Sequence, residues 1–381
     1  MPLKNGFIKE EAQMILHLCM QLNGTGTSEP LPTPPEGWSK RFDGYHGADE
    51  AKESSPRKKN QSQDGLGPYD NAWELWEKAG GKQYAIVIRG TVSDPGSVLD
   101  DALATTIRSD GFLEIGPHRR RLPLLFSPVE DGAVHLGFAW GTAILTFHKE
   151  KGILAELLKI PDQSEVYITG HSQGAAIATL LHSLLYYAGQ AGLDTPFGKE
   201  ISAKQFDIKS YVFAQPKPGN WQFTQDFAQI AGNQGRLLCL NNSRDWVTQV
   251  PFAFGLVDDI TGNPIPGVLR KLPLIGKLAA WIVTGVGMGL RWIRRLIGEL
   301  VSDSAKNARQ YLFEHIDPVY LSNQSGGDSA SASLNYDQCG ELVSLKGHPA
   351  PQEESDPFWQ HHLGVYQKLM DAQLPARLPS K

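Results

Sequence analysis

The sequence is poor in cysteine, in excess charge and in recognisable leader segments. Its 381 residues include three cysteines. Cys19, Cys239 and Cys339 are far apart and odd in number, so they predict no disulfide framework. A net charge of −5 argues against nucleic acid as the main partner. Glu10 and Glu11 precede a short apolar stretch, a pattern unlike a signal peptide. We therefore expect a reduced, cytoplasmic protein, with export by a route that needs no signal peptide left open.

Glycine, in contrast, is abundant, and one glycine-flanked serine stands out. The segment Gly170-His171-Ser172-Gln173-Gly174 follows a strand-like run at 165–169 and precedes an apolar helical run that starts near Ala175. With 39 glycines in the chain, the five-residue pattern alone is weak. Its context is specific, because a serine on a sharp strand-to-helix turn presents its hydroxyl at the edge of a sheet. Ser172 is the candidate nucleophile, and the alternative is a plain strand-to-helix turn.

The periodicity of apolar residues predicts that strands and helices alternate along the chain. The predicted strands are residues 83–88, 165–169, 208–214, 236–240 and 341–345. The predicted helices are residues 8–22, 138–147, 175–187, 221–230 and 357–370. This alternation is typical of a mainly parallel sheet with helices on both faces. Together with the serine turn, it predicts an α/β-hydrolase fold.

We expect four segments in this α/β chain. Residues 1–80 hold an N-terminal helix and a polar loop (47–68) that pack on or precede the core. Residues 81–254 form the α/β-hydrolase core, and residues 336–381 complete it with a last strand and helix. Residues 255–335 are a helical insertion.

A serine nucleophile needs a base, and the base needs a carboxylate. In α/β-hydrolases the chain order is Ser, then Asp or Glu, then His. Asp245 lies just beyond the predicted strand 236–240, at the edge of the sheet where active sites form. Asp245 is therefore the candidate acid. The alternatives are a loop-capping role for Asp245, with Asp258 or Asp259 as the acid.

Four histidines follow Asp245, at positions 315, 348, 361 and 362. His361 and His362 stand at the start of the last predicted helix, after a proline-rich loop, where a base could reach the serine turn. We favour His361, with His362 as the alternative.

The tetrahedral intermediate of acyl transfer needs hydrogen-bond donors for its oxyanion. The backbone N–H of Gln173, next to the nucleophile, is one candidate. The loop after strand 83–88 would supply the other, and Thr91 offers both an N–H and a hydroxyl. A simple glycine turn at Gly90 is the alternative explanation of that loop.

Taken in order, these segments resemble the class 3 lipases, the fungal-type lipase family. The segment 86–91 (Ile-Val-Ile-Arg-Gly-Thr) resembles the oxyanion motif of the family, and 134–138 (Val-His-Leu-Gly-Phe) resembles its His-x-Gly-Phe segment. The segment 168–176 is close to the family elbow, usually Thr-Gly-His-Ser-Leu-Gly-Gly-Ala. The segment 211–220 resembles Thr-Phe-Gly-x-Pro-x-x-Gly-Asn, and 241–251 resembles the acid segment.

The last family motif is a histidine followed five residues later by a tyrosine, which His361 and Tyr366 match. The resemblance thus implies a triad of Ser172, Asp245 and His361, with Thr91 and Gln173 at the oxyanion hole, and neither a metal nor an organic cofactor. It covers residues 83–251 well and 336–370 more loosely. The sequence departs from the family in having Gln173 for leucine, and Trp246 and Thr248 for prolines.

The insertion at 255–335 lengthens the distance between acid and base to 116 residues, against 73 between Ser172 and Asp245. Residues 260–298 hold six basic residues and no acidic one. The thirteen uncharged residues 278–290 are too few to span a bilayer, which takes about 20. Apolar residues then alternate with arginines at helical spacing. This pattern favours peripheral contact of 265–300 with an anionic membrane, or a helical lid. A second lid candidate is residues 94–110.

These observations predict a serine-dependent carboxylic ester hydrolase, a lipase or esterase. The resemblance implies acylglycerols as substrates, hydrolysed through an acyl-enzyme at a lipid interface. The basic insertion makes a phospholipase A-type activity the first alternative. A catalytically inactive lipid-binding protein is the second.

Overall fold

A computed structural model describes residues 2–45, 65–89, 106–190, 194–250, 306–325, 330–331 and 335–378. Its centre is a seven-stranded sheet with the order β1-β2-β3-β8-β9-β11-β15. The strands of this sheet are β1 (Trp38–Asp43), β2 (Ala72–Lys78), β3 (Gln83–Arg89), β8 (Glu165–His171), β9 (Asp207–Phe213), β11 (Leu237–Asn242) and β15 (Glu341–Leu345). From β3 to β15 every neighbouring pair is parallel, whereas β1 and β2 are antiparallel additions. The predicted mainly parallel sheet is therefore confirmed.

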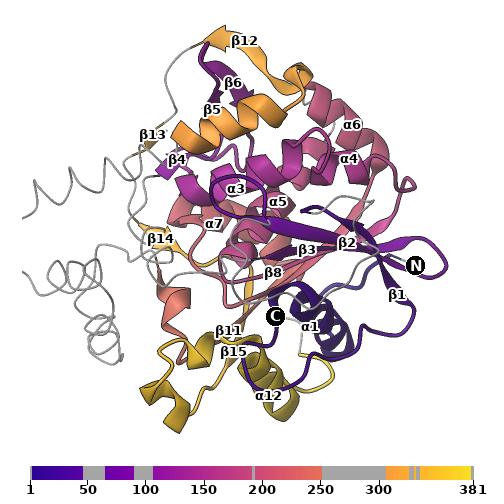
Figure 1. Cartoon of the computed structure of the whole chain (residues 1–381), viewed down its shortest axis with the longest axis vertical. Coiled ribbons are helices and arrows are strands. Elements are labelled where there is room, and N and C mark those ends of the chain that lie inside the picture. The colour runs from indigo at the N-terminus through magenta and orange to yellow at the C-terminus, as the bar shows by residue number, and fades with distance from the viewer. Residues whose placement is uncertain are drawn as a thin grey trace, which may run out of the picture.

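Helices cover both faces of this sheet (Figure 1). The helices are α1 (Lys9–Asn23), α3 (Leu136–Phe147), α4 (Ile153–Leu157), α5 (Gln173–Gly189), α6 (Pro196–Lys204), α7 (Trp221–Phe227) and α12 (Leu363–Gln373). Helices α1 and α12 lie on one side of the sheet, and α3, α5 and α7 lie on the other. Residues 306–315 are also helical.

The side chains of each central strand alternate between the two hydrophobic cores, one on each face of the sheet. In β3, Ile86 and Ile88 belong to the core under α3 and α5, whereas Ala85 and Val87 belong to the core under α1. Successive strand side chains point to opposite faces, so a strand buried on both sides must be apolar throughout. This explains why β3, β8 and β11 could be predicted as largely apolar runs, whereas β15, at the edge of the sheet, leaves Leu342 and Ser344 exposed.

Two small sheets flank the central one. They have the orders β13-β4-β7-β10-β14 and β12-β6-β5. Their strands are β4 (Thr106–Arg108), β5 (Phe112–Ile115), β6 (Arg120–Pro123), β7 (Ala133–His135), β10 (Gly219–Asn220), β12 (Ser322–Ser325), β13 (Ala330–Ser331) and β14 (Tyr336–Asp337). The described end of the segment 255–335 therefore contributes strands as well as a helix, because β12 pairs with β6 and β13 pairs with β4.

Three sequence-based expectations need correction. No strand was expected before residue 83, yet β1 and β2 extend the central sheet. Strand β2 was missed because its buried face carries a charge: Glu74 is 1% exposed and pairs with Lys40 at 2.5 Å. The helix expected at 357–370 begins at Leu363, after a 3₁₀ turn at Trp359–His361. Helix α7 ends at Phe227 and continues as a π turn (Ala228–Gly232), where a helix to 230 was expected.

Candidate active site

Ser172 lies on the sharp turn between β8 and α5. Its backbone has φ 58° and ψ −131°, a conformation that costs a non-glycine residue on the order of 1–3 kcal/mol. A hydrogen bond from the Ser172 N–H to the Phe213 carbonyl of β9, at 3.1 Å, helps to hold this turn. At Gly170 a Cβ would collide with the backbone of Gly174. The turn therefore has the strained geometry of a nucleophile elbow.

Asp245 and His361 meet at the carboxyl edge of the sheet. The Nδ1 atom of His361 lies 2.8 Å from Oδ2 of Asp245. A carboxylate only accepts, so Nδ1 carries the proton and Nε2 keeps the lone pair of a base. The Asp245 side chain is fully buried and that of His361 is 9% exposed.

Three donors hold the Asp245 carboxylate. Besides His361, the hydroxyl of Tyr366 donates to Oδ2 at 2.7 Å, and the N–H of Val247 donates to Oδ1 at 3.0 Å. Burial, followed by the negative charge of Asp245, raises the pKa of Tyr366 well above its usual range, so its phenol stays a donor. The role of Tyr366 was missed at the sequence level, although its spacing from His361 was the available signal.

His171 brings the elbow next to the base. Its ring centroid lies 4.4 Å from that of His361, and its Nε2 donates to the His361 carbonyl at 2.7 Å. Burial, reinforced by the neighbouring His361, lowers the pKa of His171 well below 6.5. His171 is therefore a neutral donor that fixes the backbone of His361, and Ser172 directly follows it.

The second histidine has a different partner. His362 Nε2 lies 2.6 Å from Oδ2 of Asp356, and His362 directly precedes α12. The structure thus brings His361, and not His362, to Asp245. Asp258 and Asp259, the alternative acids, lie outside the described residues.

The expected oxyanion donors are described in part. Gln173 is the first residue of α5, beside Ser172, where the positive end of the helix dipole lies. Thr91 lies outside the described residues. Strand β3, which leads to it, is paired with β8 so that Ile88 lies opposite Gly170. Arg89, at the end of β3, is anchored by its guanidinium to the Asp70 carbonyl at 2.8 Å.

Polar residues of the other motifs hold the loops around this edge. The Nδ1 atom of His135 accepts from the N–H groups of Gly137 and Phe138 and caps α3. The side chain of Asn220 accepts from the Phe223 N–H at 3.0 Å and caps α7. The side chain of Gln215, whose role was also not expected, donates to Thr179 on α5 at 2.7 Å and accepts from the Cys339 N–H at 3.1 Å.

Trp246, which stands where the family has proline, binds the acid loop to the base loop. Its indole N–H donates to the Pro357 carbonyl at 3.1 Å, and its ring centroid lies 5.3 Å from that of Phe358. The substitution therefore replaces a rigid residue by a contact between the two loops. The hydroxyl of Thr248, the other departure, donates to the Asp245 carbonyl at 2.9 Å.

Ser172 and Asp245 lie in a segment that matches a known family, whereas His361 lies beyond that segment. Residues 85–255 match the family described as Lipase (class 3). The chain contains a class 3 lipase domain. This class 3 lipase domain makes the chain a serine hydrolase of the lipase type, and its family implies lipid or ester substrates.

Solved structures similar to this chain are also lipases. M37 lipase is 19% identical, with 95% of this chain and 93% of that chain covered and a TM-score of 0.49. Lip2 lipase from Yarrowia lipolytica is 17% identical, with 67% and 78% covered and a TM-score of 0.40. A lipase from Rhizopus microsporus var. chinensis is 19% identical, with 65% and 71% covered and a TM-score of 0.40. No curated protein matches the sequence.

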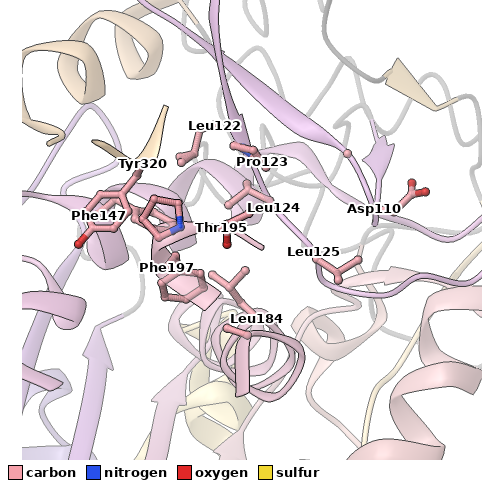
Figure 2. Close-up of a pocket in the computed structure, with 13 residues that line it drawn as sticks. Asp110, Leu122, Pro123, Leu124, Leu125, Phe147, Leu184, Thr195, Phe197 and Tyr320 are labelled. Atoms are coloured by element: carbon pink, nitrogen blue, oxygen red, sulfur yellow. The ribbon is translucent and has the colours of Figure 1, made fainter. Parts of the chain in front are cut away.

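An apolar pocket of about 250 Å³ lies away from the lipase site residues (Figure 2). Leu184 and Ala188 line it from the far end of α5, with Phe147, Phe197 and Tyr320 around them. Leu184 is 12 residues after Ser172 along α5, which corresponds to roughly 18 Å at 1.5 Å per residue. None of the 13 residues that line this pocket is a candidate catalytic residue, so the pocket is not the candidate active site.

Within the described residues, no helix is long and apolar enough to cross a bilayer. Among the side chains that the structure places, no group of three His, Cys, Asp or Glu is arranged to hold a metal ion. The basic stretch 265–300 and most of the lid candidate 94–110 lie outside the described residues.

Proposed function

We propose that this chain hydrolyses the carboxylic ester bonds of acylglycerols through an acyl-enzyme on Ser172. His361 is the general base and Asp245 orients it. The observation that carries the proposal is the 2.8 Å contact between His361 Nδ1 and the buried Asp245 carboxylate, formed beside the strained Ser172 turn. A lone pair on Nε2 and a hydroxyl on a tight elbow are the two parts that serine catalysis needs.

The reaction has two halves. His361 Nε2 takes the proton of the Ser172 hydroxyl as Oγ attacks the ester carbonyl carbon. The tetrahedral intermediate collapses, the ester C–O bond breaks, and His361 returns the proton to the leaving alcohol. Water, deprotonated by the same nitrogen, then attacks the acyl-enzyme and releases the fatty acid and Ser172.

The oxyanion of the intermediate is stabilised by the Gln173 N–H and by Thr91. The position of Gln173 at the start of α5 supports the first assignment. The register that places Ile88 opposite Gly170 supports the second, because Thr91 follows Ile88 by three residues and Ser172 follows Gly170 by two. Each such donor is typically worth about 2.7–4 kcal/mol in the transition state.

Hydrolysis of a short p-nitrophenyl ester tests this proposal. We expect Ser172→Ala and His361→Ala to lose activity by at least about a thousandfold, the scale at which triad members act. His362→Ala serves as the matched control and should retain activity. A fluorophosphonate should label the wild type and not Ser172→Ala. Turnover that survives Ser172→Ala would contradict the mechanism, and binding of lipid without any turnover would favour the inactive lipid-binding alternative.

The composition of residues 260–298, with six basic residues and no acidic one, favours a second candidate, phospholipase A-type activity at an anionic membrane surface. We propose that residues 265–300 make this peripheral contact. Vesicles of phosphatidylcholine with and without phosphatidylglycerol, compared with triglyceride emulsion, separate the candidates by the fatty acid released. If more fatty acid is released from phospholipid than from triglyceride, phospholipase A-type activity replaces the acylglycerol proposal.

A further inference from the structure

The loops that carry Asp245 and His361 come from distant parts of the chain, 116 residues apart. Side chains next to each catalytic candidate nevertheless bind one another directly. From the acid loop these are Asn242 and Arg244, and from the base loop they are Glu353 and Gln360. We name this set of four residues the loop latch.

Gln360, the residue before His361, is the centre of the loop latch. Its side-chain Oε1 and its backbone carbonyl both accept from Asn242 Nδ2, at 2.8 and 2.9 Å. Its Nε2 donates to Glu353 Oε1 at 2.5 Å and to the His348 carbonyl at 2.8 Å. Gln360 is 6% exposed and Asn242 is 1% exposed. Buried polar groups that are satisfied in this way hold one geometry.

Glu353 closes the latch back onto the acid loop. Its Oε2 accepts from the Arg244 guanidinium at 2.9 Å, and its Oε1 also accepts from the Ala350 N–H at 2.9 Å. The Arg244 N–H in turn donates to Oδ1 of Asn242 at 3.1 Å. The four residues thus form a closed ring of hydrogen bonds that spans both loops.

We propose that Gln360 and Glu353 are positioning residues that hold His361 in register with Asp245. The proposal rests on the function proposed above, in which His361 is the base. The loop latch does not contact the reacting atoms, so it acts through His361. A displacement of about 1 Å at a catalytic group can cost roughly a hundredfold in rate. The competing explanation is that the latch only stabilises the fold.

The variants Gln360→Leu, Glu353→Ala and Arg244→Ala open the latch, and Glu353→Gln keeps an acceptor for the Gln360 and Ala350 donors. The chain offers a matched control in Arg41. Arg41 pairs with Glu77 at 2.8 Å with side chains 34% and 30% exposed, against 2.9 Å with 32% and 22% for Arg244 and Glu353. The pair lies on β1 and β2, at the opposite edge of the sheet from β15.

For the latch variants we expect kcat on a soluble p-nitrophenyl ester to fall roughly tenfold to hundredfold, with KM within about twofold of the wild type. The acidic limb of the kcat/KM profile should move to lower pH, because a loosened Asp245 stabilises imidazolium less. Glu353→Gln should recover most of the activity lost in Glu353→Ala. Arg41→Ala should match the wild type. If the latch variants lose activity only in proportion to their folded fraction, the positioning role is wrong.

A second readout does not depend on turnover. In a Ser172→Ala background, the ¹⁵N shifts of the His361 imidazole report whether its proton sits on Nδ1, with His361→Gln used to assign the signal. We expect the Nδ1–H tautomer in the parent protein and a tautomer mixture in Gln360→Leu. The same Nδ1–H signal in folded Gln360→Leu would overturn the proposal. Absence of Ser172-dependent hydrolysis in the wild type would instead count against the proposed function, and the tautomer would still decide whether the latch positions His361.

Discussion

The hydroxyl of Tyr366 donates to the same Asp245 oxygen that accepts from His361, at 2.7 Å. The phenol oxygen also accepts from the Asn242 N–H at 3.1 Å. Tyr366 lies in α12 and Asn242 ends β11, so one hydroxyl joins the last helix, the acid loop and the carboxylate of the proposed triad.

Replacing Tyr366 with phenylalanine removes this hydroxyl with little change of shape. We expect kcat for ester hydrolysis to fall roughly tenfold to hundredfold, because a hydrogen bond to a charged group contributes about 1.5–3 kcal/mol. Steady-state kinetics measure the effect. Tyr320→Phe is the matched control, since the Tyr320 hydroxyl donates to the Glu200 carboxylate at 2.9 Å on the far side of the fold. An equal loss of kcat in both variants would contradict a specific role for Tyr366.

Three histidines with lowered pKa values predict how stability depends on pH. Burial is the main cause that lowers the pKa of His148 to about 4, of His182 to about 3, and of His171 well below 6.5. The unfolded chain binds protons near pH 6.5, and the folded chain does not. Stability is therefore fully present above about pH 6.5 and is lost as the pH falls toward the folded values, by up to about 1.4 kcal/mol per pH unit for each histidine.

Urea unfolding at pH 7.5 and 5.5 measures this loss. In the variant His182→Gln the glutamine side chain can still bond Ser210. The difference in free energy of unfolding between the two pH values should become smaller by the contribution of one histidine. A free energy of unfolding that is equal at both pH values would refute the prediction.

A buried ion pair holds α1 on the sheet. Lys209 Nζ lies 2.6 Å from Glu11 Oε2, and the Lys209 side chain is fully buried. Burial lowers the pKa of Lys209, and the hydrogen bond that Lys209 donates to Glu11 opposes that effect. We expect Glu11→Ala to lower the free energy of unfolding by about 3–5 kcal/mol, because it leaves a buried ammonium without its counterion.

Urea unfolding again measures the change, with exposed Glu10→Ala in the same helical turn as the matched control. The control should change stability by less than about 0.5 kcal/mol. The double variant Glu11→Ala with Lys209→Met should recover part of the loss. A loss below about 1 kcal/mol in Glu11→Ala would show that water reaches Lys209.

Deletion of residues 265–297 tests the proposed interfacial contact. We expect activity on aggregated lipid to fall at least roughly tenfold more than activity on a soluble short-chain ester, because a basic amphipathic segment gains free energy only at the membrane surface. The two activities are measured on one preparation. Equal losses on both substrates would eliminate the interfacial role.

Much of the fold could be predicted from local patterns. The strands β3, β8 and β11 are largely apolar runs because both of their faces are buried, and the Ser172 turn is defined by neighbours within two residues. Strands β1 and β2 could not be predicted in the same way. They carry Lys40 and Glu74, charges that are acceptable in a sheet because each is the partner of the other, and such a partnership across 34 positions leaves no local signal.

Local sequence patterns were also insufficient to decide which histidine is the proposed base. The motif favoured His361, but His362 is its neighbour and has its own carboxylate, Asp356. The choice between them depends on the 3₁₀ turn at Trp359–His361, which was expected to be helix.

The sequence by itself determined the class 3 lipase resemblance, the parallel strands and the serine elbow, because these depend on residues close together in the chain. Only the tertiary structure decided which histidine meets Asp245 and how Tyr366, Trp246 and the loop latch hold that pair. The partners are more than 100 residues apart, and their contacts exist only once the strands, turns and helices that carry them have packed together.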